Sequence, residues 1–243
     1  MRHKKIMIVS GLLLLLITGL ISFKINTKSI DDEILAYIVD SKTQDLQLFW
    51  KNDKGEILKS IQELKSYVER KNKKLVFAMN GGMYMANNNP LGLYIQEQHL
   101  YAPLNTRSGK GNFYTKPNGV FYITTDNLVR ICKTGDFVKN DKIKYATQSG
   151  PMLVIDGQIH SAFKLGSTSL YIRNGVGILP DNRIVFAMSK KEINFYDFAK
   201  YFQNLGCKNA LYLDGFVSRT YLPEKNWAQT DGNFGVMFGV IKK

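Results

Sequence analysis

The stretch from residue 194 to residue 215 reads NFYDFAKYFQNLGCKNALYLDG, and its pattern changes from helical to extended along its length. Apolar side chains recur with the spacing of one helix face at Phe195, Phe198, Ala199, Phe202 and Leu205. Asn194 suits the N-cap and Asp197 the third helical position, while Gly206 suits the end of the helix. Ala210 to Leu213 then reads as a buried strand that ends in Asp214-Gly215. The stretch therefore predicts a helix followed by a strand with a carboxylate at its end.

Outside this stretch the chain reads mainly as short strands joined by turns. A second helix is predicted from Ser60 to Lys71, where apolar residues recur at helical spacing. Asp156-Gly157 predicts a hairpin turn between two strands. The other predicted strands are residues 34–39, 46–50, 75–79, 91–95, 120–124, 128–131, 152–155, 170–172, 184–188 and 234–241. Since no repeat or long linker divides residues 34–243, we expect one β-rich α+β domain with a mixed or antiparallel sheet and a few packed helices.

The N-terminus has the composition of an export signal. Arg2, Lys4 and Lys5 precede an apolar run from Ile6 to Phe23. This run of 18 residues is close to the shortest that spans a bilayer, so residues 1–23 predict a signal anchor or a cleaved signal peptide. The basic residues on its N-terminal side place the body outside the cytoplasm, membrane-anchored or secreted. Residues 24–33 are polar and read as a linker.

Composition and missing motifs exclude several classes of protein. The chain of 243 residues is 44% hydrophobic, which indicates a globular protein, and its net charge of +13 favours anionic partners. There is no Gly-rich nucleotide loop and no GxSxG elbow, so we expect no nucleotide cofactor. The few histidines and the absence of zinc spacing predict no metal site, and no basic helix or RNA-binding motif points to nucleic acid. Cys132 and Cys207 could form one disulfide, but two free, buried thiols are the favoured interpretation.

Four segments place polar side chains beside glycines at predicted strand ends. They are Asn80-Gly81-Gly82, Ser149-Gly150, Arg173-Asn174-Gly175 and Asp214-Gly215 with Ser218 and Arg219. Glycine lets a backbone approach a ligand closely, and guanidinium suits oxyanions. Each segment alone is a weak signal, and a strand that ends in Asp-Gly is more often followed by a hairpin turn. Together with the basic charge, they predict one polar site that binds an oxyanion, with Asn80, Ser149, Arg173, Asp214 and Ser218 lining a single cleft.

From about Leu75 to Val240 these segments, in this order, resemble the phosphodiester glycosidase family, and most closely its uncharacterised bacterial members. The likeness is carried by the stretch 194–215 and by the segments NGGMY (residues 80–84), KPNGVF (116–121) and SGPMLV (149–154). The resemblance implies hydrolysis of the bond between a sugar anomeric carbon and a phosphodiester oxygen. Two residues depart from the family pattern. Phe216 stands where the family has a small residue, and Arg219 stands where it has a second serine or an alanine.

The resemblance gives the candidate residues their roles. Asp214 becomes the catalytic carboxylate and Arg173 the phosphate clamp, while Asn80 and Ser218 orient sugar hydroxyls or water. A second carboxylate stays open between Glu192 and Asp231. The substrate-binding candidates are Gly81, Gly82, Asn118, Ser149, Gly150, Asn174, Gly215 and Arg219. The expected partner is a sugar phosphodiester or phosphoglycan. The alternative function is a catalytically inactive glycan-binding module at the cell surface.

Overall fold

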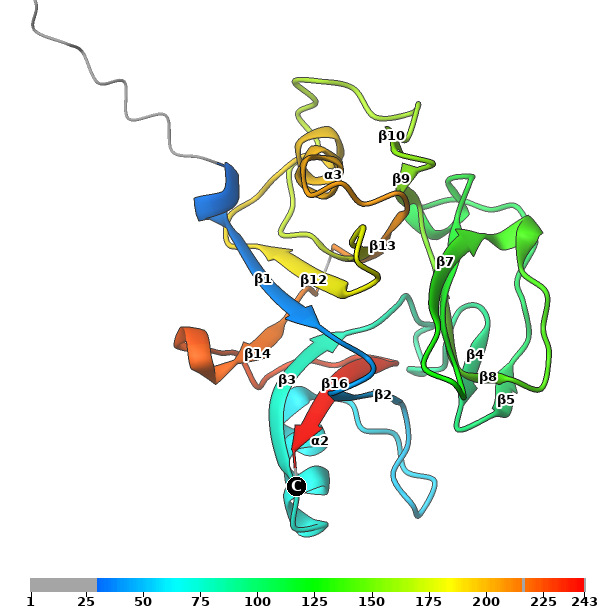
Figure 1. Cartoon of the computed structure of the whole chain (residues 1–243), viewed down its shortest axis with the longest axis vertical. Coiled ribbons are helices and arrows are strands. Elements are labelled where there is room, and N and C mark those ends of the chain that lie inside the picture. The colour runs from blue at the N-terminus through cyan, green and yellow to red at the C-terminus, as the bar shows by residue number, and fades with distance from the viewer. Residues whose placement is uncertain (1–29, 216, 243) are drawn as a thin grey trace, which may run out of the picture.

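The computed structural model describes residues 30–215 and 217–242. The predicted leader, most of the predicted linker and Phe216 lie outside the described residues. At the end of that linker, Ile30–Glu33 forms the 3-10 helix η1. Within the described residues, no helix is both long and apolar enough to cross a membrane. These residues form a β-rich domain in which every strand pair is antiparallel, arranged in three sheets (Figure 1).

The first sheet has six strands and packs against helix α3 (Phe195–Asn204). Its spatial order is β1 (Ile34–Val39), β12 (Ile184–Ser189), β11 (Asn174–Ile178), β13 (Ala210–Asp214), β9 (Met152–Ile155) and β10 (Gln158–Ile159). Asn194 caps α3 as predicted, since its side-chain oxygen accepts from Asp197 N at 2.9 Å. The hairpin between β9 and β10 turns at Asp156 and Gly157 with positive φ at both, which confirms that predicted turn.

The second sheet has five strands and packs against helix α2 (Ile61–Arg70). Its order is β15 (Trp227–Ala228), β14 (Thr220–Leu222), β3 (Lys74–Asn80), β16 (Met237–Lys242) and β2 (Asp45–Phe49). Ser60 caps α2 by accepting from Glu63 N at 3.1 Å, which confirms the helix start that the sequence predicts.

The third sheet also has five strands. Its order is β5 (His99–Ala102), β4 (Tyr94–Gln96), β8 (Ile143–Ser149), β6 (Gly119–Thr124) and β7 (Val129–Lys133). The 3-10 helices η2 (Asn112–Tyr114) and η3 (Thr134–Asp136) belong to the loops before β6 and after β7. A further 3-10 helix, η4 (Pro223–Lys225), joins β14 to β15 in the second sheet.

One hydrophobic core joins the three sheets. Phe186 of the first sheet lies 5.1 Å from Phe77 and 4.8 Å from Phe238 of the second, measured between ring centroids. Phe238 also meets Phe121 of the third sheet edge to face at 5.2 Å. All four rings are fully buried, and packed aromatic rings add specific geometry to their large buried area. The shared core fixes the relative positions of strands that lie far apart in the sequence.

Three sequence predictions need correction. The structure has three antiparallel sheets rather than one. Residues 170–172 are not a strand: Tyr171 forms only an isolated bridge to Ile193, because the chain there bends around the Arg173 guanidinium, which binds Ser169 O at 2.9 Å. The strand begins at Asn174 instead. The prediction also lacks strands β5, β8, β14 and β15. Strand β8 was missed because its sequence IKYATQS has no alternating apolar pattern, although nearly all of it is buried.

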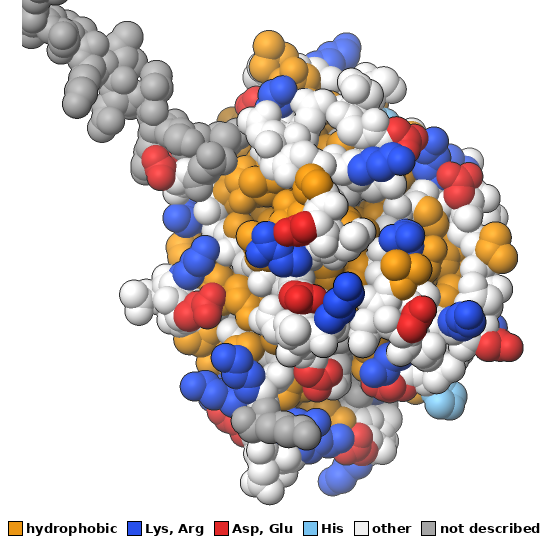
Figure 2. All heavy atoms as spheres, viewed as in Figure 1, with side chains coloured by type: hydrophobic (Ala, Val, Ile, Leu, Met, Phe, Trp, Pro, Cys, Tyr) orange, Lys and Arg blue, Asp and Glu red, His pale blue; other side chains and the backbone are white. Residues whose placement is uncertain are grey.

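Surface charge is mixed on the face seen in Figure 2. Lysine and arginine side chains there are interspersed with acidic ones and with exposed apolar groups. The ion pairs among the described residues are exposed or half-exposed, such as Lys71 with Asp53 at 2.8 Å, and pairs of that kind contribute little to stability.

Candidate active site

Three of the predicted polar residues meet where the first and second sheets adjoin. Asn80 ends β3 in the second sheet, Asp214 ends β13 in the first, and Asn174 begins β11 beside it. Asn174 is paired in register with Asp214, and Asn80 with Met237 of β16. Two strand ends and one strand start thus bring together side chains that are up to 134 residues apart.

A hydrogen-bond network joins these three residues, which we call the amide floor (Asn80, Asn174 and Asp214). Asn174 Nδ2 donates to Asn80 Oδ1 at 2.7 Å and to Asn80 O at 3.1 Å. Asn174 Oδ1 accepts from Asp214 N at 2.8 Å, and Asn80 Nδ2 donates to Asp214 Oδ2 at 3.4 Å. Both asparagines are fully buried, so their amides have one consistent orientation and hold the carboxylate in place.

The chain after β13 is tied to the amide floor. Arg219 N donates to Asn80 Oδ1 at 2.9 Å, and Gly215 N donates to Asp214 Oδ1 at 2.6 Å. Ser218 is buried, and its hydroxyl donates to Asp214 O at 3.0 Å and to Ile172 O at 3.2 Å. The Arg219 guanidinium turns outward and pairs with Asp231 at 2.9 Å. Ser218 and Arg219 therefore hold the turn through contacts with other protein groups.

Asp214 lines a pocket of about 360 Å³. Its side chain is only 7% exposed and lies at the inner boundary of that pocket. The other described residues that line it come from two loops and from the turn after β13: Met83, Tyr84, Met85, Ala86, Leu91, Lys110, Gly111, Asn112, Phe113, Tyr114 and Val217. We call residues 83–86 and 110–114 the pocket walls. A buried carboxylate that opens into a partly apolar pocket is the arrangement expected of a binding or catalytic site.

Two wall residues bring further chemistry close to Asp214. Tyr84 is half-buried, and burial raises the pKa of its phenol, with the nearby Asp214 carboxylate adding to the rise. Its hydroxyl therefore stays protonated and is a hydrogen-bond donor near neutral pH. Lys110 places an exposed ammonium on the opposite loop. The sequence prediction did not include Lys110, although the Lys-Gly-Asn-Phe-Tyr run combines a cation, a glycine and two aromatic rings.

Arg173 does not line this pocket. Its guanidinium is fully buried and donates to Ile193 O at 2.8 Å and Ser169 O at 2.9 Å, and its carbon lies 3.6 Å from the Phe195 ring centroid. In the described part of the chain the guanidinium has no carboxylate partner, and burial lowers its pKa. Because side chains alternate along an extended chain, Arg173 points away from the face that Asn174 presents. The expectation that Arg173 shares the cleft of Asp214 is not met.

Arg173 nevertheless contacts the back of the Asp214 turn through Tyr212. Arg173 Nη1 donates to the Tyr212 hydroxyl at 3.3 Å. That hydroxyl approaches Gly215 so closely that a Cβ at Gly215 would lie 1.6 Å from it. Burial raises the pKa of Tyr212 strongly, and the charge on Asp214 contributes to the rise. Gly215 is thus required for close packing directly beside the carboxylate.

The remaining predicted binding residues lie behind the pocket. Ser149 is fully buried and donates to Leu213 O at 2.9 Å, next to Asp214 in the chain. Asn118 donates to the carbonyl of the wall residue Phe113 at 2.9 Å, and a Cβ at Gly150 would lie 2.5 Å from Asn118 Cβ. Cβ atoms at Gly81 and Gly82 would come within 2.9 Å of Phe238 and 2.8 Å of Thr147. These residues let the strand ends pack closely.

Neither candidate for a second carboxylate lines the pocket. Asp231 is paired with Arg219, and Glu192 is exposed next to α3. Among the described residues there is no cluster of three or more His, Cys, Asp or Glu side chains that could hold a metal ion. Cys132 and Cys207 are both free thiols in the structure.

Comparison with known proteins identifies relatives of this chain. A sequence model of the phosphodiester glycosidase family matches residues 73–240. The uncharacterized protein YigE of Escherichia coli (strain K12) is 38% identical over 190 residues, which cover 78% of this chain and 74% of that protein.

Solved structures share the fold at low identity. The catalytic domain of zebrafish N-acetylglucosamine-1-phosphodiester α-N-acetylglucosaminidase, auto-inhibited by its pro-peptide, matches with a TM-score of 0.57 at 15% identity over 87% of this chain and 83% of that chain. A hypothetical protein from Synechocystis matches with a TM-score of 0.56 at 12% identity over 86% of this chain and 59% of that one. The family match, which spans more than half of the chain, and the relative from Escherichia coli show that the chain belongs to the phosphodiester glycosidase family.

Proposed function

We propose that the chain hydrolyses the bond between the anomeric carbon of a sugar and the oxygen of a phosphodiester. The observation that carries the proposal is Asp214, which lines a pocket that a lysine also lines. The buried Asn80 contacts its carboxylate, and the buried Asn174 accepts from its backbone N–H. Membership of the family supports the reaction class. The zebrafish relative is named for the removal of α-N-acetylglucosamine, which makes that sugar the first to test.

In the proposed reaction the bond between C1 and the phosphate oxygen breaks, and its electron pair stays on the phosphate. A phosphate monoester is a good leaving group, so stabilising its charge matters more than protonating it. Water forms the new bond to C1 and gives its proton to Asp214, which also faces the positive charge that develops at the sugar. Lys110 is the cation that we place on the phosphate. Tyr84 donates a hydrogen bond to the phosphate or to a sugar hydroxyl.

The other predicted residues take positioning roles. Asn80 orients the carboxylate, while Asn174 and Ser218 hold the backbone of Asp214. For Arg173 we propose support of Tyr212 and Gly215 in place of the expected phosphate clamp, because its guanidinium is buried and already bonded. Residues 1–23 we propose to be an export signal or anchor that directs the domain, residues 34–243, out of the cytoplasm.

The test is to incubate the purified chain with an α-N-acetylglucosamine 1-phosphodiester in water enriched in oxygen-18. We expect free N-acetylglucosamine and a phosphate monoester that contains no oxygen-18, because the bond at carbon breaks. Oxygen-18 in the phosphate would mean attack at phosphorus and would contradict the proposal. Binding of several such glycans without any turnover would favour the alternative, an inactive glycan-binding module. The reason to consider this alternative is that Phe216 and Arg219 depart from the family pattern.

A further inference from the structure

The described chain begins at the same end of the first sheet that holds the amide floor. Strand β1 starts at Ile34, which is paired with Ser189 at the end of β12. Asn174 at the start of β11 is paired with Met188 on one side and with Asp214 on the other. The chain therefore enters the domain at the end of the sheet where the Asp214 carboxylate lies.

The start of the chain is fixed to the loop between β12 and α3. In this loop Lys190 N donates to Glu33 O at 2.8 Å. The same loop contacts the long connection between β10 and β11, because Ile193 and Tyr171 form an isolated antiparallel bridge. Residues 161–172 of that connection, which we call the tip loop, are thus held close to the point where the chain enters.

The body of the tip loop is packed, while its apolar tip is exposed. The Phe163 ring stacks on the Phe195 ring at 4.7 Å, which places the loop beside α3 (Figure 1). Ser167 N donates to Lys164 O at 3.2 Å and closes a turn. Leu165 is the second residue of this turn and is 74% exposed. Glycine, proline and short polar residues are the usual choice for such turns, so a leucine at the tip is unusual.

Leu165 belongs to a group of exposed apolar side chains. Leu170 and Tyr171 in the same loop are also exposed. The loop contains one basic residue, Lys164, and no aspartate or glutamate. Apolar side chains together with a lysine and no acidic group suit a bilayer surface, where leucine and tyrosine enter the headgroup region and the ammonium stays near the phosphates.

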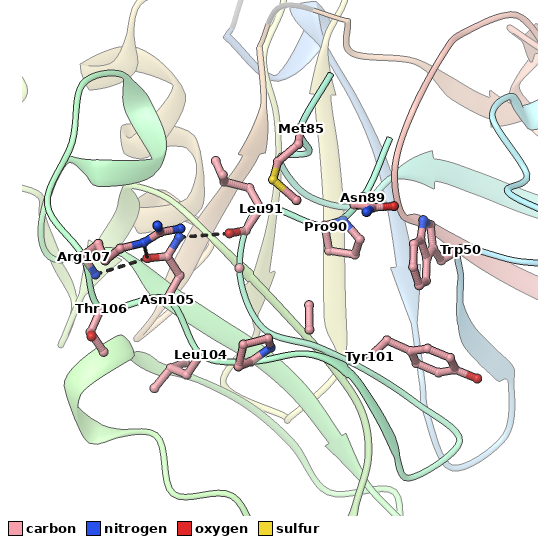
Figure 3. A pocket seen from close by; sticks show the side chains of 13 residues that line it. Trp50, Met85, Asn89, Pro90, Leu91, Tyr101, Leu104, Asn105, Thr106 and Arg107 are labelled. Atoms are coloured by element: carbon pink, nitrogen blue, oxygen red, sulfur yellow. Dashed lines mark hydrogen bonds between the residues drawn. The ribbon is translucent and has the colours of Figure 1, made fainter. Parts of the chain in front are cut away.

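Exposed apolar side chains elsewhere do not share this link to the start of the chain. Tyr101, for example, lines a pocket of about 460 Å³ between the loop before β4 and the loop after β5 (Figure 3). Its ring packs there against Trp50 at 5.7 Å. That pocket belongs to the third sheet, whereas the tip loop is bonded to the loop that fixes the start of the chain.

The length of chain before Ile30 limits the distance between this end of the domain and a membrane. Residues 24–29 separate the predicted anchor, residues 1–23, from Ile30. Six residues span at most about 20 Å when fully extended. A domain of this size is about 40 Å across, so the end that holds the start of the chain is the one that faces the bilayer.

We propose that the tip loop rests on the surface of the membrane that the N-terminal segment spans, with Leu165, Leu170 and Tyr171 among the lipid headgroups. Lys164 lies beside the lipid phosphates. The inference rests on the anchor in the proposed function and does not depend on the proposed hydrolysis. The end of the first sheet that holds Asp214 then faces the bilayer, so the site acts on molecules at the membrane surface.

In the test, the full chain carries a tryptophan at the tip and is reconstituted in vesicles of brominated phosphatidylcholine with phosphatidylglycerol. Bromine quenches tryptophans that contact lipid. The fluorescence added by Leu165→Trp should be quenched severalfold more than that added by Val138→Trp. Val138 is the matched control, because it is 75% exposed and lies in the loop between β7 and β8 of the third sheet. Both positions are exposed, so neither change should disturb folding.

A second pair of variants tests whether apolar contact holds the loop on the lipid. In the Leu165→Trp chain, Leu170→Asn should reduce the quenching about twofold, because it removes an apolar side chain from the contact. Leu100→Asn on β5 should leave the quenching unchanged, and the two leucines are matched at 45% and 48% exposure. An equal effect of the two asparagine substitutions would contradict the contact.

The failures of the separate proposals can be told apart. Equal quenching of Leu165→Trp and Val138→Trp, in a chain that stays with the vesicles through an alkaline wash, would overturn the membrane surface and leave the anchor standing. A chain that the wash removes would overturn both. A blue shift of the Leu165→Trp emission that depends on the number of chains per vesicle and not on bromine would assign the loop to a second copy and overturn the lipid contact. Hydrolysis enters none of these measurements.

Discussion

The amide floor and the pocket walls differ in how completely their polar groups are used. In the floor, Asn80 and Asn174 are fully buried and bonded to each other, to Asp214 and to the Arg219 backbone. In the walls, Lys110 and Met85 are exposed, and Tyr84 is half-buried. A satisfied buried network fixes geometry, whereas exposed loop side chains remain free to meet a ligand. We infer that the floor sets the reaction and the walls set the substrate.

The largest effect is expected at the carboxylate of the floor. Asp214→Asn keeps the shape but removes the charge, so kcat should fall by a factor on the order of 10² to 10⁴, as for the loss of one acid-base group. Thermal unfolding of the variant must show that it folds. Asp141→Asn is the control, because Asp141 is exposed and lies outside the Asp214 pocket. A folded Asp214→Asn variant with wild-type kcat would remove Asp214 from the mechanism.

A smaller effect is expected where the floor orients that carboxylate. Asn80→Asp places a second carboxylate 3.4 Å from Asp214 Oδ2 and removes the donor that faces it. Like charges so close raise a pKa, so the acidic limb of the kcat/KM profile should move to higher pH, and the rate at neutral pH should fall about 10- to 100-fold. An unchanged pH profile with a lower rate would mean that Asn80 is only structural.

The turn behind the floor should respond to a single added methyl group. Gly215→Ala puts its Cβ 1.6 Å from the present position of the Tyr212 hydroxyl, so we expect a loss of about 1–3 kcal/mol in the free energy of unfolding. Tyr212→Phe removes the clashing oxygen, and the double variant should recover part of the loss. Urea unfolding of the wild type, the two single variants and the double variant measures the coupling energy between residues 212 and 215. Simple additivity of the two changes would contradict the close contact.

The walls should tolerate substitution without loss of stability. Lys110→Ala removes the cation that we place on the leaving phosphate, and we expect kcat/KM to fall up to about tenfold at low salt, with little change in the melting temperature. Added salt should shrink the difference from the wild type. Lys139→Ala, on an exposed loop away from the pocket, is the matched control. An unchanged kcat/KM at low salt would contradict the placement of Lys110 on the phosphate.

The smallest effect is expected in the aromatic layer behind the floor. His160 stacks on Phe163 at 4.8 Å and Phe163 on Phe195 at 4.7 Å, and burial lowers the pKa of His160 below its ordinary value of 6.5. The unfolded chain therefore binds the proton more readily, so this contribution is fully present above pH 6.5 and is lost as pH falls toward the folded-state pKa. The melting temperature should be lower at pH 5.5 than at pH 7.5. His160→Gln should weaken that dependence, and His99→Gln, at an exposed site, should not.

The same contrast explains which parts of the site the sequence predicts. Asn80, Asn174 and Asp214 stand at strand ends beside glycines, and this local pattern is visible without the fold. The two helices and most strands follow from apolar periodicity and capping residues such as Ser60 and Asn194. The β-rich single domain with antiparallel sheets was therefore predictable.

The parts that were not predicted depend on contacts between distant segments. Lys110 and the other wall residues come from loops whose sequences show no periodic pattern, and these loops form a pocket only where they meet in space. Arg173 was placed in the cleft because its guanidinium suits an oxyanion, yet alternation along the chain turns its side chain to the face opposite that of Asn174. Strand β8 was missed because Gln148 is buried through bonds to loop backbone groups rather than by apolar packing.

The order in which the site strands occur along the chain has a consequence for the timing of activity during synthesis. Asn80 is made in the first third of the chain, Asp214 only near its end, and the strand that pairs with Asn80 consists of Met237–Lys242. A nascent chain emerges from the ribosome N-terminus first. No partly synthesised chain can then hold Asn80 against Asp214 in the described geometry. The enzyme that we propose would remain inert until Met237–Lys242 had emerged, and before then it would not meet intracellular sugar phosphodiesters in a competent form.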